Sequence, residues 1–152
     1  FRFFPETKYI QTNGGSLPRV TDGKLDYFRG MATSGNVDAE SQFVQIDLGG
    51  GFPMERALVY WRALAYPKSY EISVSADGQK WIKIADKLDA KTGSPARSEE
   101  GDPIILKETL LKGYNARHFR LTVPKGAKRE SKHREWNFVQ IMEVKIYPVL
   151  PR

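Results

Sequence analysis

Short runs in which apolar and polar residues alternate recur along this chain. They predict half-buried β-strands, because successive side chains of a strand point to opposite faces. The residues from Phe43 to Leu48 have this pattern, as do residues 57–61 and 81–84 in weaker form. The predicted buried positions are Val44, Ile46 and Leu48, then Tyr70, Ile72 and Val74, then Phe119, Leu121 and Val123, and finally Met142, Val144 and Ile146.

Turn residues separate these runs. Asp77-Gly78 lies between two strand patterns, and this pair accommodates the positive φ of a tight hairpin turn. Gly49-Gly50-Gly51, followed by Pro53, predicts that the chain breaks after Leu48. Pro124 has no N–H to donate to a sheet, so it predicts the end of the strand before it.

Helical periodicity is weak along the whole chain. The best helix candidate, Leu106–Leu111, is short and lacks a good cap. Many short strands with few helices predict an all-β sandwich or jelly roll, and 152 residues suit one domain, residues 1–152. We expect a monomer.

Composition and charge narrow the function classes. The chain has no cysteine, which excludes disulfides, thiol nucleophiles and cysteine metal sites. No run approaches the roughly 20 apolar residues of a membrane span. The 24 Lys and Arg residues exceed the 18 Asp and Glu residues by six. This balance favours an acidic partner, such as nucleic acid, an anionic membrane surface or an acidic polysaccharide, although solubility alone also explains it.

Four segments carry a family resemblance in their order. They are Val20–Lys24 (VTDGK), Phe43–Gly49 (FVQIDLG), Ser69–Trp81 (SYEISVSADGQKW), and the closing pair Ala116–Leu121 (ARHFRL) and Met142–Tyr147 (MEVKIY). From about Val20 to Tyr147 the chain resembles the discoidin-like (F5/8 type C) family, which includes the family 32 carbohydrate-binding modules (CBM32). The resemblance implies an eight-stranded β-sandwich jelly roll of the galactose-binding-like fold, with its ligand site in loops at one end. Fold alone does not fix function, because relatives bind sugars, phospholipid head groups or proteins.

The resemblance also implies one structural Ca²⁺. Asp22 matches the carboxylate of the family's TDG loop, and Glu143 matches a carboxylate near the final strand. Calcium takes six to eight oxygen ligands, so carbonyls of a tight loop suit it. Tyr27 stands where the family often has Thr, and it offers only its carbonyl. The implied ligand set is Arg19, Asp22, Lys24, Tyr27, Met142 and Glu143. In the alternative interpretation Asp22 is a turn residue and Glu143 faces solvent.

A basic run in residues 124–136 supplies the strongest ligand signal. It holds five Lys or Arg residues against two Glu residues. An aromatic ring packs against the apolar face of a pyranose, and Arg suits a carboxylate. We therefore predict an acidic polysaccharide, such as polygalacturonate (pectin), as ligand. The binder is expected to be a periplasmic or secreted bacterial module, either stand-alone or part of a larger enzyme. The predicted ligand-binding residues are Tyr27, Arg29, Arg62, Tyr66, Lys68, Lys128, Arg129, Lys132, His133, Arg134 and Trp136.

No catalytic constellation is visible in the sequence, so we expect a binding module rather than an enzyme. The chain has two histidines, and His118 is interpreted as a surface residue. Trp61 and Trp81 are interpreted as core residues. Three alternatives stay open: a nucleic-acid or protein interaction module on the same fold, a neutral galactose-type sugar binder around His133 and Trp136, and a phospholipid binder. Nucleic acid is disfavoured, because the basic residues cluster in one loop without the sheet-face aromatics of single-strand binders.

Overall fold

The computed structural model describes residues 10–12, 41–62, 66–67, 69–84, 104–125 and 140–149. Within these ranges the chain forms strands and turns and no helix, which confirms the all-β prediction. No helix in the described part is long and apolar enough to span a membrane. The strands are β1 (Ile10–Thr12), β2 (Gln42–Arg62), β3 (Glu71–Ser75), β4 (Ile82–Ile84), β5 (Ile104–Leu110), β6 (Asn115–Val123) and β7 (Ile141–Pro148).

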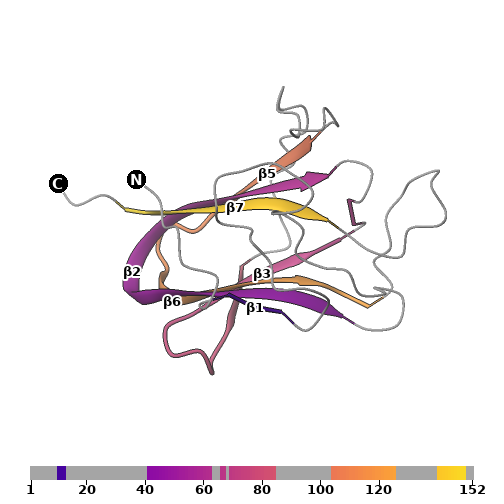
Figure 1. Ribbon diagram of the computed structural model, residues 1–152. Coiled ribbons are helices and arrows are strands. Elements are labelled where there is room, and N and C mark those ends of the chain that lie inside the picture. Colours follow the sequence, from indigo (N-terminus) through magenta and orange to yellow (C-terminus); the bar gives the residue numbers. More distant parts are fainter. Residues whose placement is uncertain are drawn as a thin grey trace.

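One long strand, β2, belongs to both layers of the sandwich (Figure 1). Its first half pairs with β1 and β6, and its second half pairs with β5 and β7. The larger sheet has the order β1-β2-β6-β3-β4, and the smaller sheet places β5 and β7 on either side of β2. All of these pairings are antiparallel.

The prediction that Gly49-Gly50-Gly51 and Pro53 break the strand is wrong. β2 continues through them, and its register against β6 shifts between Asp47 and Phe52. Gly49 has φ +83°, a backbone conformation that residues with a Cβ rarely adopt. The glycines therefore let one strand turn from the larger sheet into the smaller one.

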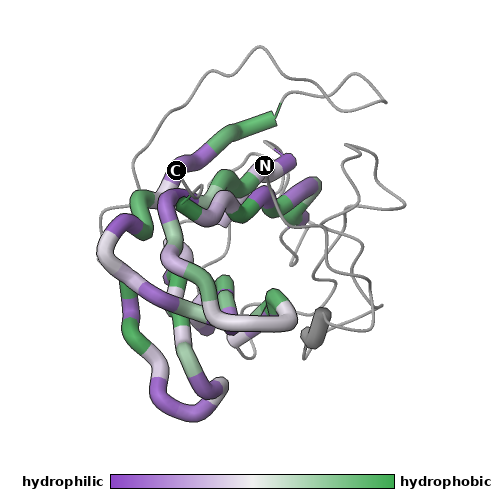
Figure 2. The backbone as a smooth tube through the Cα atoms, turned by 90° about the vertical axis from the view of Figure 1, so that its left-hand side faces the viewer, coloured by the Kyte–Doolittle hydropathy of each residue, from purple (hydrophilic) through white to green (hydrophobic). Residues whose placement is uncertain are grey.

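The core lies between the two sheets, where the predicted apolar faces meet. All twelve predicted buried positions are buried, from Val44 on β2 to Ile146 on β7. Trp61 has no exposed surface, which confirms it as a core residue. Figure 2 shows the same alternation of hydrophobic and hydrophilic residues along the strands. Burial of this apolar area, at about 25 cal/mol per Å², is the main force that holds the two layers together.

The predicted hairpin at Asp77-Gly78 is confirmed, with a longer connection than a tight two-residue turn. Val74 pairs with Ile82, and residues 76–81 connect the end of β3 to the start of β4. The Asp77 carboxylate accepts hydrogen bonds from the N–H groups of Gln79 (2.8 Å) and Lys80 (2.9 Å), which lower its pKa. Gly78 adopts φ +79°. The turn thus satisfies its own backbone donors.

The best helix candidate, Leu106–Leu111, is wrong, because these residues lie on and just after strand β5. The seven residues Ile104–Leu110 pair in register with β2. A short apolar run fits a helix or a strand equally, and here the pairing with β2 makes the segment a strand. The predicted strand end at Pro124 is confirmed, since β6 ends at Val123.

Candidate functional site

The end of β6 and the start of β7, which flank residues 126–139, lie at one end of the sandwich, on the right in Figure 1, together with the start and the end of β2. The register places Gln42 beside Val123, Arg62 beside Ile104, and Trp61 beside Ile141. We call this the loop end. The opposite end, which we call the bend end, contains the bend of β2, the hairpin connection 76–81 and the β5–β6 connection 111–114.

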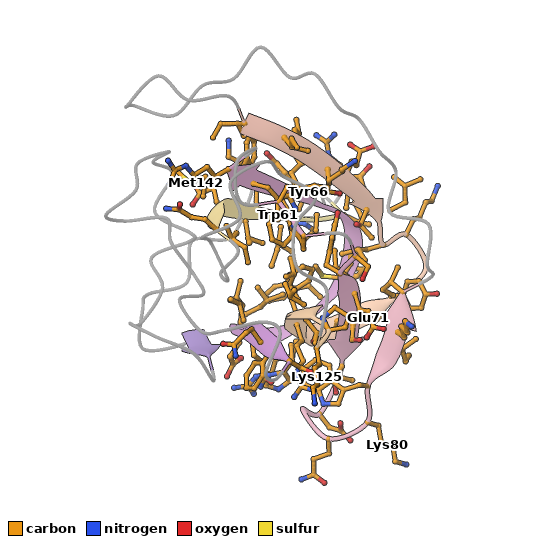
Figure 3. All side chains as sticks on the ribbon, turned by 90° about the vertical axis from the view of Figure 1, so that its right-hand side faces the viewer. Trp61, Tyr66, Glu71, Lys80, Lys125 and Met142 are labelled. Carbon is orange, nitrogen blue, oxygen red and sulfur yellow. The ribbon has the colours of Figure 1, made fainter. Side chains whose placement is uncertain are left out.

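Three aromatic rings pack together at the loop end. Trp61 lies 4.9 Å from Tyr70 and 5.8 Å from Tyr66 between ring centroids, and Tyr66 lies 6.5 Å from Tyr70. Figure 3 looks onto this end and shows Trp61 and Tyr66 close together, away from Lys80 on the hairpin. Tyr66 is partly buried against the core, and this burial raises the pKa of its hydroxyl. Tyr66 thus anchors its segment, and only part of its surface remains for a ligand.

A lysine that sequence analysis missed lies beside this cluster. Lys107 pairs with Val59 on β2 and is only 6% exposed, and its Nζ lies 5.4 Å from the centroid of the Tyr66 ring. Burial lowers the pKa of Lys107. It makes no ion pair within the residues that the structure describes. The helical interpretation of this segment hid the lysine, because only a strand register turns Lys107 towards the core.

Arg62, a predicted ligand residue, ends β2 at the same place. Its Nη1 donates to Oε1 of Gln140 at 3.1 Å, and its backbone N–H donates to the Gln140 carbonyl at 3.0 Å. Gln140 is buried just before β7. The arginine is therefore held between the end of β2 and the start of β7. The other predicted ligand residues lie outside the described residues: Tyr27, Arg29, Lys68, Lys128, Arg129, Lys132, His133, Arg134 and Trp136.

Two of the predicted calcium ligands, Met142 and Glu143, are described. Glu143 is fully buried, so the alternative that it faces solvent is wrong. Tyr60 pairs with Glu143 and Trp61 with Ile141, so Met142 is the extra residue of a β-bulge. A bulge removes backbone groups from the ladder, and calcium takes oxygen ligands of the kind that the Met142 carbonyl and the Glu143 carboxylate offer. The residues present thus fit a cation bound by carbonyl and carboxylate oxygens.

The described part of the chain holds no cluster of three or more His, Cys, Asp or Glu side chains suited to a metal. A cation beside Glu143 would therefore need carbonyl groups or the remaining predicted ligands. Arg19, Asp22, Lys24 and Tyr27 lie outside the described residues.

The outward face of the larger sheet also differs from the prediction. Trp81 is half-buried and packs outside the core, so its interpretation as a core residue is wrong. The Arg120 guanidinium carbon lies 3.9 Å from the centroid of Trp81 and 5.4 Å from that of Phe43. Nε and Nη2 of Arg120 both donate to Oε1 of Gln45, at 3.0 and 2.7 Å.

His118 lies on the same face in a row of Asp47, His118 and Ser75. His118 faces outward, as predicted for a surface residue, although its ring is half-buried against Trp81 and its Nδ1 is buried. The row does not form a nucleophilic triad. Ser75 Oγ donates to Asp77 at 3.1 Å, and Arg117 Nε donates to Asp47 at 2.8 Å, which lowers the Asp47 pKa.

Solved structures share this fold at low sequence identity. CpGH89CBM32-6 of Clostridium perfringens matches with a TM-score of 0.63 and 20% identity over 91% of both chains. CpGH89CBM32-4 of the same organism, in complex with GlcNAc-α-1,4-galactose, matches with a TM-score of 0.62 and 17% identity over 90% of this chain and 87% of that one. Chitosan-binding module 1 of a Paenibacillus sp. IK-5 chitosanase/glucanase matches with a TM-score of 0.61 and 19% identity over 91% and 92%.

These likenesses establish the β-sandwich fold. No curated protein matches the chain. The sequence profile of the F5/8 type C domain matches residues 6–144, which is most of the sequence. The chain therefore belongs to the F5/8 type C domain family.

Proposed function

We propose that this protein is a non-catalytic carbohydrate-binding module that holds an acidic polysaccharide, such as polygalacturonate, at its loop end. One observation carries the proposal: the described strand ends that flank the predicted ligand segments lie together at that end. Two cations from the scaffold lie there: Arg62 is bonded to Gln140, and Lys107 lies beside Tyr66. Similar structures include a module in complex with GlcNAc-α-1,4-galactose and a chitosan-binding module.

The charge of the basic run favours an acidic ligand over a neutral one. Residues 124–136 hold Lys125, Lys128, Arg129, Lys132 and Arg134 against Glu130 and Glu135. A neutral pyranose needs only a few hydrogen-bond donors, whereas a polymer of uronic acids presents a carboxylate on every sugar. Guanidinium groups bind carboxylates through two parallel hydrogen bonds. Many weak contacts along the polymer then add up to useful avidity.

A structural calcium ion at Glu143 and Met142 is part of the same proposal. The buried Glu143 carboxylate and the bulge at Met142 support it, because both place oxygen atoms where a hard cation binds. The ion would fix the start of β7, beside Arg62 and Gln140. We propose that it supports the loop end and does not contact the sugar.

Affinity electrophoresis in gels that contain polygalacturonate, galactan or heparin tests the ligand class. The Arg129→Ala/Arg134→Ala double variant should lose retardation by polygalacturonate, since each charged hydrogen bond contributes about 1.5–3 kcal/mol, or at least roughly tenfold in affinity. The matched control is Lys80→Ala/Lys112→Ala, which removes the same charge from exposed positions at the bend end. This control should bind like the wild type.

Three outcomes would overturn the proposal. Equal losses in both double variants would mean attraction by net charge alone. Equal retardation by heparin and polygalacturonate, or competition by duplex DNA with a steep salt dependence, would favour a nucleic-acid or general polyanion binder. Retardation by galactan alone would favour a neutral-sugar pocket and make the basic run incidental.

A further inference from the structure

The outward face of the larger sheet carries a polar row that crosses four strands. The register places Gln45 on β2 beside Arg120 on β6, Arg120 beside Ser73 on β3, and Ser73 beside Lys83 on β4. Phe43 lies beside this row, and Trp81 packs over Arg120. We call Phe43, Gln45, Ser73, Trp81, Lys83 and Arg120 the outer sheet face.

Arg120 is held rigidly at the centre of this face. Its guanidinium stacks on Trp81 and lies near Phe43, while two of its nitrogens donate to Gln45. Its third nitrogen, Nη1, makes no hydrogen bond within the described part of the chain. A guanidinium that is fixed before binding loses little side-chain entropy when it binds a ligand.

The charges of this face are balanced everywhere except at Arg120. Lys83 Nζ lies 2.9 Å from a carboxylate oxygen of Glu71, and Arg117 Nε lies 2.8 Å from one of Asp47. Arg120 makes no ion pair with a carboxylate among the residues that the structure describes. A bound anion would therefore balance the charge of Arg120.

We propose that the outer sheet face is a second binding surface of this protein, on which Arg120 holds a carboxylate of a uronate chain. This inference takes its ligand class from the proposed function, but it uses none of the loop-end residues. Four adjacent strands span three inter-strand spacings, or roughly 14 Å. A row of this length suits a short stretch of polysaccharide better than a single small anion, and Gln45, Ser73 and Lys83 offer hydrogen-bonding groups for the flanking sugars.

A nuclear magnetic resonance titration with trigalacturonate tests this surface. We expect shifts of the Arg120 Nε–H and Trp81 indole N–H signals, together with the amides of Gln45 and Ser73. Fully methyl-esterified trigalacturonate, which has the same sugars without the charge, should leave these signals in place. If trigalacturonate shifts only signals around Arg62 and Tyr66, the second surface is wrong and the proposed loop-end site stands. If it shifts no signal at all, both are wrong.

Two variants and a control separate recognition from folding. Arg120→Gln should weaken the trigalacturonate affinity that the sheet-face signals report roughly tenfold. Arg120→Lys keeps the charge but loses the planar guanidinium group, and it should weaken this affinity nearly as much. Arg56→Gln is the matched control. The guanidinium carbon of Arg56 also lies over an aromatic ring, 4.7 Å from the centroid of Tyr147, but its Nη1 is paired with Glu108 Oε2 at 3.1 Å. Wild-type titration curves for the two Arg120 variants would overturn the inference.

Discussion

Substitution of Gly78 by alanine should destabilise the protein through two separable costs. Gly78 has φ +79°, and an alanine Cβ there would lie 3.2 Å from His118 Nε2, with two ring carbons at 3.4 and 3.5 Å. The left-handed backbone costs about 1–2 kcal/mol. Rotation of the His118 ring away from its rotamer, against Trp81, costs about 0.5–1.5 kcal/mol. The sum, roughly 1.5–3.5 kcal/mol, lowers Tm by roughly 3–14 °C for a chain of this size.

Two other glycines isolate the backbone cost. Gly49 has φ +83°, and nothing lies within 4 Å of the position that an alanine Cβ would occupy, so Gly49→Ala should cost about 1–2 kcal/mol from the backbone alone. Gly51 has neither a positive φ nor a close neighbour, so Gly51→Ala should change stability by less than about 0.5 kcal/mol. The predicted order of destabilisation is Gly78→Ala, then Gly49→Ala, then Gly51→Ala.

Urea unfolding of each variant, in the wild-type and His118→Ala backgrounds, measures both costs. Truncation of His118 removes the ring that the new Cβ meets, so Gly78→Ala should become cheaper there by about 0.5–1.5 kcal/mol. The cost of Gly49→Ala should be the same in both backgrounds. An unchanged cost of Gly78→Ala without the imidazole would refute the packing argument. Equal costs for Gly78→Ala and Gly49→Ala would refute it as well.

Three further predictions concern charged groups. Ca²⁺ at about 100 times its Kd should stabilise the fold by about 2.7 kcal/mol and raise Tm by roughly 5–11 °C in calorimetry. Glu143→Gln should lose most of this gain. A wild-type Tm that is equal in EDTA and in calcium would contradict the site. Because Arg117 lowers the pKa of Asp47, that carboxyl stabilises the fold at neutral pH and ceases to do so as the pH falls below about 4. Asp47→Asn should therefore be less stable than the wild type in urea at pH 7, and the difference should shrink as the pH falls below about 4. Burial lowers the pKa of Lys107, so the folded protein loses the lysine proton at a lower pH than the unfolded chain does. The unfolding free energy of the wild type should therefore rise relative to that of Lys107→Met between pH 7 and about 10 in the same assay. A difference between the two proteins that stays constant with pH would contradict the burial argument.

The strands were predictable from the sequence because each has one face in the core. The alternation of apolar and polar residues predicts that Val44, Ile46 and Leu48 are buried, and all three are buried in the structure. The hairpin was predictable from Asp77-Gly78, because the turn chemistry is local. Both signals depend only on residues that are neighbours in the chain.

The errors arose where a distant segment decides the structure. The glycines after Leu48 signal a flexible backbone, but the pairing of β2 with four different strands turns that flexibility into a bend. Leu106–Leu111 is a strand because β2 offers it a ladder. Trp61 and Trp81 look alike in sequence, and only the sheet register places one in the core and the other against Arg120.

The structure brings two of the predicted ligand residues together, and their role in binding stays a prediction. Arg62 and Tyr66 were predicted to belong to the candidate site, and the structure brings both to the loop end. Lys107 and Arg120 were missed, because neither stands in a basic run. Each is conspicuous only through its surroundings: Lys107 is a buried cation, and Arg120 is stacked on a ring with no carboxylate partner in the described part of the chain.

The two proposed surfaces adjoin, and this makes polymer length a test of both. Gln42 and Val123 pair at the loop end, and the next pair in the register, Phe43 and Thr122, already lies on the outward side of the larger sheet. A uronate polymer that occupies both surfaces gains from effective concentration, which raises avidity by about 10²–10⁴ without any new contact. Trigalacturonate is too short to gain in this way. Arg120→Gln should therefore weaken polygalacturonate retardation strongly in affinity gels and leave the loop-end response to trigalacturonate unchanged. If the variant weakens both equally, Arg120 acts through the fold of the sheet rather than through a ligand.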